Sequence, residues 1–396
     1  MAFVLAHVSD LHVSTFGDTL HDRTRIVRRS THPADASPLR YEEVWAEAGW
    51  RVLRERGKKA GRALAILDPE GYAHAPPPRG DFPELRDPLE RAAAKACRLE
   101  ARRATTLAGS PPSDGALALL AEATPRNANV RLLRAMRVVE QAGVDAVAIT
   151  GDITDDGDGY DIVLAACAPW RPARMLFAVP GNHDRYLFPF SGSTRPKPTA
   201  ASKAEAWRAF AHELDLPLQP CGAYVRPIPE ADAVVLGLDT CARPQRRFFR
   251  HNGAVGPEQL AFVEEVGRLP EWRDKKHRIV LLHHHVVPLP HGVGKRAPTE
   301  IGMRLDDART AAEAFDRIGA TLVMHGHRHV SEERQPAGLH FTLLAAPSLT
   351  LGCRSGDGPS FWRVELGEHV YASRVRIPVE AVEEDELEPE QELEPE

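Results

Sequence analysis

Short apolar runs that end in clusters of Asp, His, Asn or Gly recur along the chain, and this pattern most strongly limits the possible folds. Such runs begin near residues 3, 145, 175, 233, 278 and 321. Each has the length and composition of a buried strand. Patterns at helical spacing lie between several of them, at about 130–141, 257–269 and 308–318. This alternation predicts parallel or mixed sheets covered by helices, in which sites form at the carboxyl ends of the strands.

Five clusters at the ends of these runs carry residue types that bind metals. They are Asp10-x-His12, Gly151-Asp152, Gly181-Asn182-His183-Asp184, His283-His284-His285 and Gly326-His327-x-His329. A single D-x-H or G-H-x-H motif is a weak signal, because short motifs also arise by chance. Five of them in this order, each after an apolar run, indicate one site that several loops build together.

In this order, and without a substitution, the five clusters resemble the signature of the calcineurin-like metallophosphoesterase superfamily. The resemblance covers about residues 1–30 and 128–376, the predicted catalytic domain. It implies an α/β fold, a four-layered α/β/β/α sandwich. The Gly151–Gly157 and Leu238–Thr240 segments are similar to those of bacterial class III cyclic-nucleotide phosphodiesterases.

The resemblance also implies two divalent metal ions with a shared ligand. One ion would take Asp10, His12, Asp152 and His329, and the other would take Asp152, Asn182, His283 and His327, with Asp152 bridging. Such mixed nitrogen and oxygen ligands suit Mn, Fe, Co or Zn. In the triple histidine, His283 is the expected ligand and His284 the alternative. Because alternate residues at a strand end share a face, His327 and His329 are expected to reach adjacent ions.

His183 is not a ligand in this family pattern. It faces the substrate, where it would protonate the leaving oxygen or stabilise the phosphoryl charge. We expect Asp184 to hydrogen-bond the other ring nitrogen of His183 and to raise its basicity. The alternative is that the pair only marks a helix N-terminus that begins at Asp184.

The implied activity is hydrolysis of a phosphodiester, or of a phosphomonoester, by attack of a metal-bound hydroxide. A protein Ser/Thr phosphatase and a nucleotide-sugar-lipid pyrophosphatase are alternatives within the same fold. A binding or scaffold protein on this fold is a non-enzyme alternative, but none of the expected ligands is missing. The chain has no G-x-S-x-G motif, which argues against a Ser-His-Asp hydrolase. The natural substrate and the oligomeric state stay open.

The segment 31–127 interrupts the alternation of strands and helices, and we expect it to be a mostly helical insertion. Because it follows the Asp10-x-His12 loop, it would form a cap at the rim of the site. Residues 41–67 fit an amphipathic helix with one basic side, formed by Arg51, Arg54, Lys58 and Arg62. That side would be a solvated face or a contact for anionic lipid-like substrates and membrane surfaces. Asp87-Pro88-Leu89-Glu90 predicts a helix start.

Charge and composition exclude several classes of protein. The net charge of -6 arises from the C-terminal segment 377–396, which we expect to be an acidic disordered tail. The rest of the chain is nearly neutral, so no nucleic-acid partner is expected. No apolar window reaches the roughly 18 residues of a membrane span. The five cysteines form no C-x-x-C pair, which favours reduced thiols and a cytoplasmic location.

Overall fold

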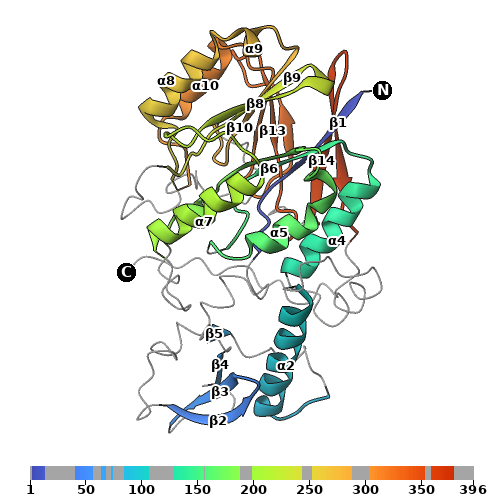
Figure 1. Ribbon diagram of the computed structural model, residues 1–396, viewed down its shortest axis with the longest axis vertical. Coiled ribbons are helices and arrows are strands. Elements are labelled where there is room, and N and C mark those ends of the chain that lie inside the picture. Colours follow the sequence, from blue (N-terminus) through green and yellow to red (C-terminus); the bar gives the residue numbers. More distant parts are fainter. Residues whose placement is uncertain are drawn as a thin grey trace.

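Two sheets lie at the centre of the molecule, with helices on their outer sides (Figure 1). The computed structural model describes residues 2–13, 41–56, 64–67, 73–74, 84–106, 128–155, 157–187, 199–242, 252–287, 303–352 and 358–378. Residues 379–396 of the predicted tail, residues 14–40 and parts of the insertion lie outside these ranges.

The first central sheet has five strands in the order β15-β14-β1-β6-β7. They are β1 (Phe3–Val8), β6 (Ala146–Thr150), β7 (Leu176–Val179), β14 (Ser360–Leu366) and β15 (Val370–Arg376). In its middle, β1 runs parallel to β6 and antiparallel to β14. Strands from before and after the insertion therefore build one sheet.

The second central sheet has six strands in the order β12-β13-β11-β10-β9-β8. They are β8 (Tyr224–Ile228), β9 (Ala233–Gly237), β10 (His277–Leu281), β11 (Leu322–His325), β12 (Glu332–Arg334) and β13 (Thr342–Ala345). The four inner strands are parallel, and only the edge strands β8 and β12 are antiparallel to their neighbours. The six apolar runs of the sequence are β1, β6, β7, β9, β10 and β11, so their prediction as strands is confirmed.

Alternate side chains of these strands enter different apolar cores. On β9, Val235 packs in the core that includes both sheets, whereas Val234 and Leu236 pack in the core with the outer helices. Those helices are α8 (Gly256–Val266), α9 (Pro270–Arg273) and α10 (Ala308–Arg317). The first sheet is covered by α4 (Ala128–Gln141), α5 (Tyr160–Ala166) and α7 (Ala200–Glu213) (Figure 1). A strand buried on both faces requires a layer on each side, and the predicted α/β/β/α arrangement is confirmed.

The insertion differs from its prediction. The described residues of the segment 41–67 form strands rather than a helix: β2 (Tyr41–Glu47), β3 (Trp50–Glu55) and β4 (Leu64–Leu67), followed by β5 (Ala73–His74). These four strands form an antiparallel sheet. The predicted helix start at Asp87 is confirmed, because α2 spans Pro88–Thr106 and Asp87 Oδ1 accepts a hydrogen bond from Leu89 N at 2.9 Å.

A tight turn explains why the helix prediction for residues 41–67 was wrong. Ala48 and Gly49, which join β2 to β3, both have left-handed backbone, with φ of 49° and 82°. That conformation suits a two-residue hairpin turn and cannot continue a helix. The side chains of Trp50, Val52 and Ile66 then pack against α2 in a small core of their own. Gly49 is therefore a turn residue between two paired strands.

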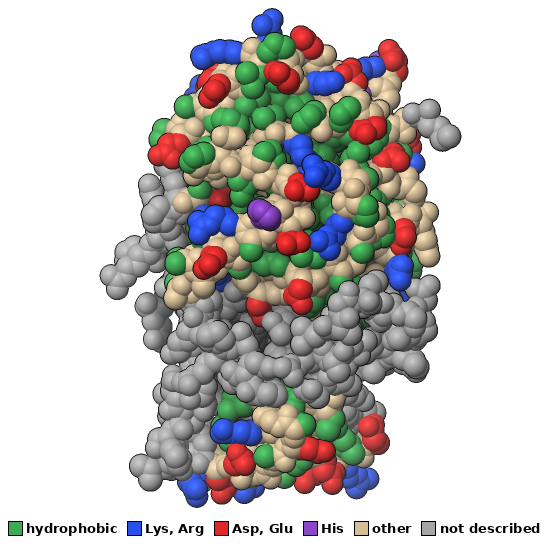
Figure 2. Space-filling view, in the orientation of Figure 1, with side chains coloured by type: hydrophobic (Ala, Val, Ile, Leu, Met, Phe, Trp, Pro, Cys, Tyr) green, Lys and Arg blue, Asp and Glu red, His purple; other side chains and the backbone are tan. Residues whose placement is uncertain are grey.

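The continuous basic side expected for such a helix is absent from the described part of the insertion. Arg51 Nε lies 3.0 Å from Glu43 Oε2, and Arg54 lies 2.6 Å from Glu42 Oε1, both across the β2–β3 pair. Figure 2 shows acidic and basic side chains together at the end of the molecule where Figure 1 places these strands. Lys58 and Arg62 lie outside the described residues.

Among the described residues, no helix combines the length and the apolar character that crossing a membrane requires.

Candidate metal centre

The residues of the five clusters meet where parallel strands of both sheets end. They follow β1 (Asp10, His12), β6 (Asp152), β7 (Asn182), β10 (His283) and β11 (His327, His329). Backbone hydrogen bonds tie these loops together. Asp10 N donates to Gly151 O at 3.0 Å, and Leu349 N donates to Ser9 O at 3.0 Å, which joins the loops of the two sheets.

Left-handed backbone is concentrated at these residues. In the described ranges nine non-glycine residues have positive φ, and five are predicted ligands: Asp10 (52°), His12 (48°), Asp152 (45°), His327 (74°) and His329 (48°). Such residues cost about 1–3 kcal/mol each and persist where the surroundings impose them. The strain is typical of a functional site, where the backbone must aim several side chains at one point.

Two motif glycines allow the loops to approach closely. A Cβ placed on Gly181 would collide with the backbone and carboxylate of Asp152, and one on Gly326 would collide with Ser9. A larger residue at either position would push the loops apart. The glycines of G-N-H-D and G-H-x-H are therefore required by packing between loops.

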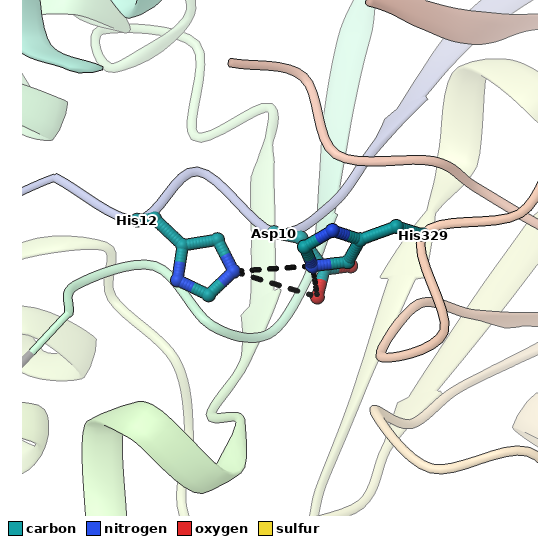
Figure 3. Close-up of side chains that lie close together, drawn as sticks. All are labelled: Asp10, His12 and His329. Carbon is teal, nitrogen blue, oxygen red and sulfur yellow. Dashed lines mark hydrogen bonds and ion pairs between the residues drawn. The ribbon is translucent and has the colours of Figure 1, made fainter. Parts of the chain in front are cut away.

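Asp10, His12 and His329 form the first group (Figure 3). His329 Nε2 lies 3.2 Å from Asp10 Oδ1 and 3.2 Å from His12 Nε2. Asp10 Oδ1 is buried and makes no hydrogen bond within the described part of the chain. Two ring nitrogens and an unsatisfied carboxylate oxygen thus point at one place, which fits the ligand set of a divalent cation.

Asp152, Asn182, His283 and His327 form the second group. His283 Nε2 lies 3.4 Å from Asp152 Oδ2 and 3.0 Å from Asn182 Oδ1, and the His283 and His327 rings are 4.9 Å apart. Asp152 Oδ2 is also 4.0 Å from His12 Nε2 in the first group. Asp152 therefore lies between the two groups, where a bridging ligand would be needed.

The three consecutive histidines have different surroundings. The first, His283, contacts Asp152 and Asn182, and its Nδ1 is 2.8 Å from Thr150 O. His284 Nδ1 instead lies 2.8 Å from Thr240 Oγ1. The geometry favours His283 over the alternative, His284.

His327 and His329 reach the site for a reason other than strand alternation. Strand β11 ends at His325, so both residues lie in the loop beyond it, and the prediction that they share a strand face was wrong. Their left-handed backbone turns the loop instead. His327 N donates to Asp10 Oδ2 at 3.0 Å, which anchors this loop to the one after β1.

Asp184 does not bond the ring of His183, and that expectation was wrong. The carboxylate of Asp184 is buried and accepts hydrogen bonds from the backbone N–H groups of Ile153, Thr154 and Gly181 and from the hydroxyls of Thr154 and Tyr160. Asp184 also lies inside α6 (Asn182–Arg185) and does not begin it. It joins the loop after β6 to the start of α6, and so supports the site through the backbone.

Asp155 occupies the place expected for Asp184. Its Oδ1 lies 3.1 Å from Nδ1 of His183 and 3.1 Å from Nδ1 of His12. One buried carboxylate thus orients both rings. The sequence carried a signal for this residue, because Asp155 follows Asp152 by three positions in the same loop, but that spacing alone did not show which histidines it meets.

The carboxylates and histidines of the site shift each other's pKa. Burial disfavours charge on His12 and His283, but Asp155 beside His12 and Asp152 beside His283 outweigh it and raise both pKa values to about 9. Burial also opposes charge on Asp152, yet His283, His183 and His12 hold its pKa well below the ordinary range. The raised pKa values of His12 and His283 thus have the neighbouring carboxylates as their cause.

Metal binding is therefore expected to release protons. Near neutral pH His12 and His283 are protonated in the metal-free protein, because both pKa values are about 9. A ring must be neutral to bind a metal, so uptake should release about two protons per chain, fewer as the pH rises toward 9. Calorimetric titration with Mn²⁺ in buffers of different ionisation enthalpy measures this number. Uptake without proton release at about pH 7 would contradict the assignment of both rings.

Solved structures with low sequence identity resemble the chain. A dimetal phosphatase from Danio rerio is 13% identical, with 96% of this chain and 99% of that chain covered and a TM-score of 0.45. A purple acid phosphatase from yellow lupin (Lupinus luteus) seeds is 11% identical, with 63% and 47% covered and a TM-score of 0.41. Phosphopantetheinyl hydrolase from Mycobacterium tuberculosis is 13% identical, with 52% and 80% covered and a TM-score of 0.34. At these TM-scores the likenesses assign no activity to this chain.

Sequence comparison gives a firmer result at the level of the family. No curated protein matches the chain. The family model for calcineurin-like phosphoesterases matches residues 126–331, which is more than half of the 396 residues. The match includes the loops that carry Asp152, Asn182, His283, His327 and His329. With this match, and with the two sheets and converging loops described above, the chain belongs to the calcineurin-like phosphoesterase family.

Proposed function

We propose that the protein is a phosphodiesterase that uses two divalent metal ions. The observation that carries the proposal is the position of Asp152 between two groups of buried ligand-type side chains. Asp10, His12 and His329 would hold one ion with Asp152, and Asn182, His283 and His327 would hold the other with it. When bound, the ions supply a water nucleophile of lowered pKa and neutralise phosphoryl charge. Mn, Fe, Co and Zn all suit this set.

His183 would serve the leaving group in this proposal. Its Nδ1 faces Asp155, and Nε2 would deliver a proton to the leaving oxygen. Its backbone N–H donates to Asp152 Oδ1 at 2.8 Å, which fixes the residue beside the bridging carboxylate. His12, Asp152 and His183 also lie close enough to be considered a metal group themselves. His183 would act as a proton donor and not as a ligand, because Asp155 orients its ring as a carboxylate orients a general acid.

The choice of a diester as substrate is supported by the similarity of two segments, Gly151–Gly157 and Leu238–Thr240, to those of class III cyclic-nucleotide phosphodiesterases. A panel tests it: Mn-loaded enzyme with bis-p-nitrophenyl phosphate, p-nitrophenyl phosphate, cyclic AMP, a glycerophosphodiester and a phosphoprotein peptide. We expect the highest kcat/KM on a diester. Preference for the peptide would indicate a protein phosphatase. If no ester is hydrolysed, the proposal that the protein is an enzyme is refuted, and a binding protein on the same fold is favoured.

We further propose that residues 1–30 and 128–376 form the catalytic domain and that 31–127 is an inserted unit. Two observations support it: β1 lies between β6 and β14, and the insertion has its own small core around Trp50 and Ile66.

Replacing residues 31–127 with a short linker should therefore leave both metals bound and hydrolysis of bis-p-nitrophenyl phosphate largely intact. Preference among larger substrates should change, because a cap acts on access and not on chemistry. Metal analysis and kinetics of the deletion variant check this. Loss of both metals would show that the insertion is part of the core.

A further inference from the structure

Lys203 is a buried cation that the proposed mechanism does not use. It lies on the first turns of α7 with only 1% of its surface exposed. A buried ammonium is costly unless hydrogen bonds replace its water. Lys203 Nζ donates to His183 O at 2.7 Å and to Tyr186 O at 2.7 Å. These two hydrogen bonds join the ammonium group to the backbone of the segment that carries His183.

The two carbonyls belong to the end of α6, which is a single turn. Tyr186 N donates to Asn182 O at 2.8 Å and closes that turn. Carbonyls at a helix end have no partner within the helix, and a cation there satisfies them and favours the local dipole. A one-turn helix has little stability of its own. Lys203 therefore supplies from outside what α6 lacks.

The same side chain also contacts the loop after β6. A Cβ placed on Gly157 would lie 2.8 Å from Lys203 Cγ, so the lysine stem packs directly on that glycine. The same loop carries Asp152 and Asp155. On its other side, the peptide of His183 is fixed by its N–H bond to Asp152. Lys203 thus touches both segments that determine where the His183 ring lies.

Helix α7 gives Lys203 a rigid base. Thr199 Oγ1 accepts from Ser202 N at 3.0 Å, and Ser202 Oγ accepts from Thr199 N at 2.8 Å, which caps the helix one turn before the lysine. Further along, Trp207 and Phe210 pack in the central core. The cap and the core packing of α7 therefore fix the position of the Lys203 side chain.

We infer that Lys203 is a positioning residue for His183: it holds the backbone carbonyls around His183 so that the ring reaches the leaving oxygen. The inference rests on the proposed function of His183. Without the ammonium, the carbonyls of His183 and Tyr186 lose a buried hydrogen-bond donor. We expect the peptide group after His183 to rotate toward a different donor. A displacement of about 1 Å at the ring costs up to about 100-fold in rate.

The test is a double-mutant cycle of Lys203→Met and His183→Ala in the full chain. Alone, Lys203→Met should lower kcat on a phenyl phosphodiester by about 10- to 100-fold with little change in KM, and by less on a p-nitrophenyl ester. In the His183→Ala background the same substitution should cost less than about twofold, because a residue that acts through His183 has nothing left to position. An equal loss in both backgrounds would overturn the inference.

Ala211→Gly is the matched control, because Ala211 is buried on the same helix and glycine weakens the helix by about 1 kcal/mol. Amide hydrogen exchange of the metal-free proteins gives a readout without substrate. Exchange in residues 182–187 should be faster in Lys203→Met and unchanged in Ala211→Gly. Faster exchange in both variants, or in neither, would show that Lys203 does not hold α6.

If Lys203→Met does not fold, Lys203→Gln replaces it in both experiments, since its amide can still reach one carbonyl. It should show a smaller loss in kcat and the same dependence on His183, and an equal loss in both backgrounds would again overturn the inference. A wild-type protein that hydrolyses no ester would refute the proposed function. The exchange measurement would then still decide whether Lys203 holds the His183 segment.

Discussion

Replacing Asp152 with Ala is expected to abolish hydrolysis and to leave fewer than two metal ions per chain. Asp152 lies 3.4 Å from His283 Nε2 and 4.0 Å from His12 Nε2, so its carboxylate serves both predicted metal positions. Loss of this carboxylate removes the several kcal/mol by which a metal stabilises the charge of the transition state. The value of kcat should therefore fall by at least about 10³-fold. Metal analysis by mass spectrometry and kinetics on bis-p-nitrophenyl phosphate measure both effects.

Two further variants separate the roles of Asp152. Asp152→Asn retains an oxygen that can accept the bond from His183 N but removes the charge, and it should lose metal as Asp152→Ala does. Asn182→Ala should lose mainly the second ion, because Asn182 contacts His283 and belongs to that group alone. An Asp152→Ala protein with two bound metals and near-normal turnover would show that the ligand assignment is wrong.

His183→Ala is expected to retain both metals while kcat falls by about 10²–10⁴-fold, the usual contribution of a general acid. The loss should be largest for poor leaving groups and smallest for p-nitrophenolate, which leaves without a proton. A series of phenyl phosphodiesters with leaving groups of different pKa measures the dependence. An equal loss across the series would leave only phosphoryl stabilisation, and loss of a metal would make His183 a ligand.

Asp155 and Asp184 provide a comparison for the same experiment. Asp155→Asn weakens the bond that orients His183 and should therefore steepen the dependence on the leaving group, as a milder form of His183→Ala. Asp184→Asn disturbs a carboxylate that binds backbone N–H groups, and it should lower the melting temperature without that dependence. A steeper dependence on the leaving group in Asp184→Asn than in Asp155→Asn would instead assign the orientation of the His183 ring to Asp184.

The fold and the place of the site could be predicted from the sequence because their signals are local. Each apolar run is long enough for one buried strand, and the polar cluster after it lies at the end of that strand. Parallel strands bring their carboxyl ends to one edge of a sheet, so clusters far apart in the chain meet without any knowledge of contacts. The choice of His283 as a ligand came from the family resemblance, in which the first histidine after the apolar run ending at Leu282 matches the family position, and it stays a prediction.

The insertion could not be predicted in this way. Its apolar residues fit a helix about as well as strands over a short stretch. The positive φ values of Ala48 and Gly49 allow a tight hairpin turn between the two strands. An alanine in that conformation has no clear signal in the sequence. Packing of the hairpin against α2 then stabilises strands that would not persist alone.

The sequence by itself determined which residue types end each strand, and hence that Asp10, Asp152, His283 and His327 share one edge. Only the tertiary structure decided which carboxylate orients His183. Asp184 is its neighbour in the chain but turns to the backbone of another loop, whereas Asp155, 28 residues away, reaches the ring. The tertiary structure likewise decided that Lys203 bonds the backbone carbonyls at the end of α6. The physical reason is that hydrogen-bond partners between loops depend on how separate strands pack, and no local pattern in the chain encodes that distance.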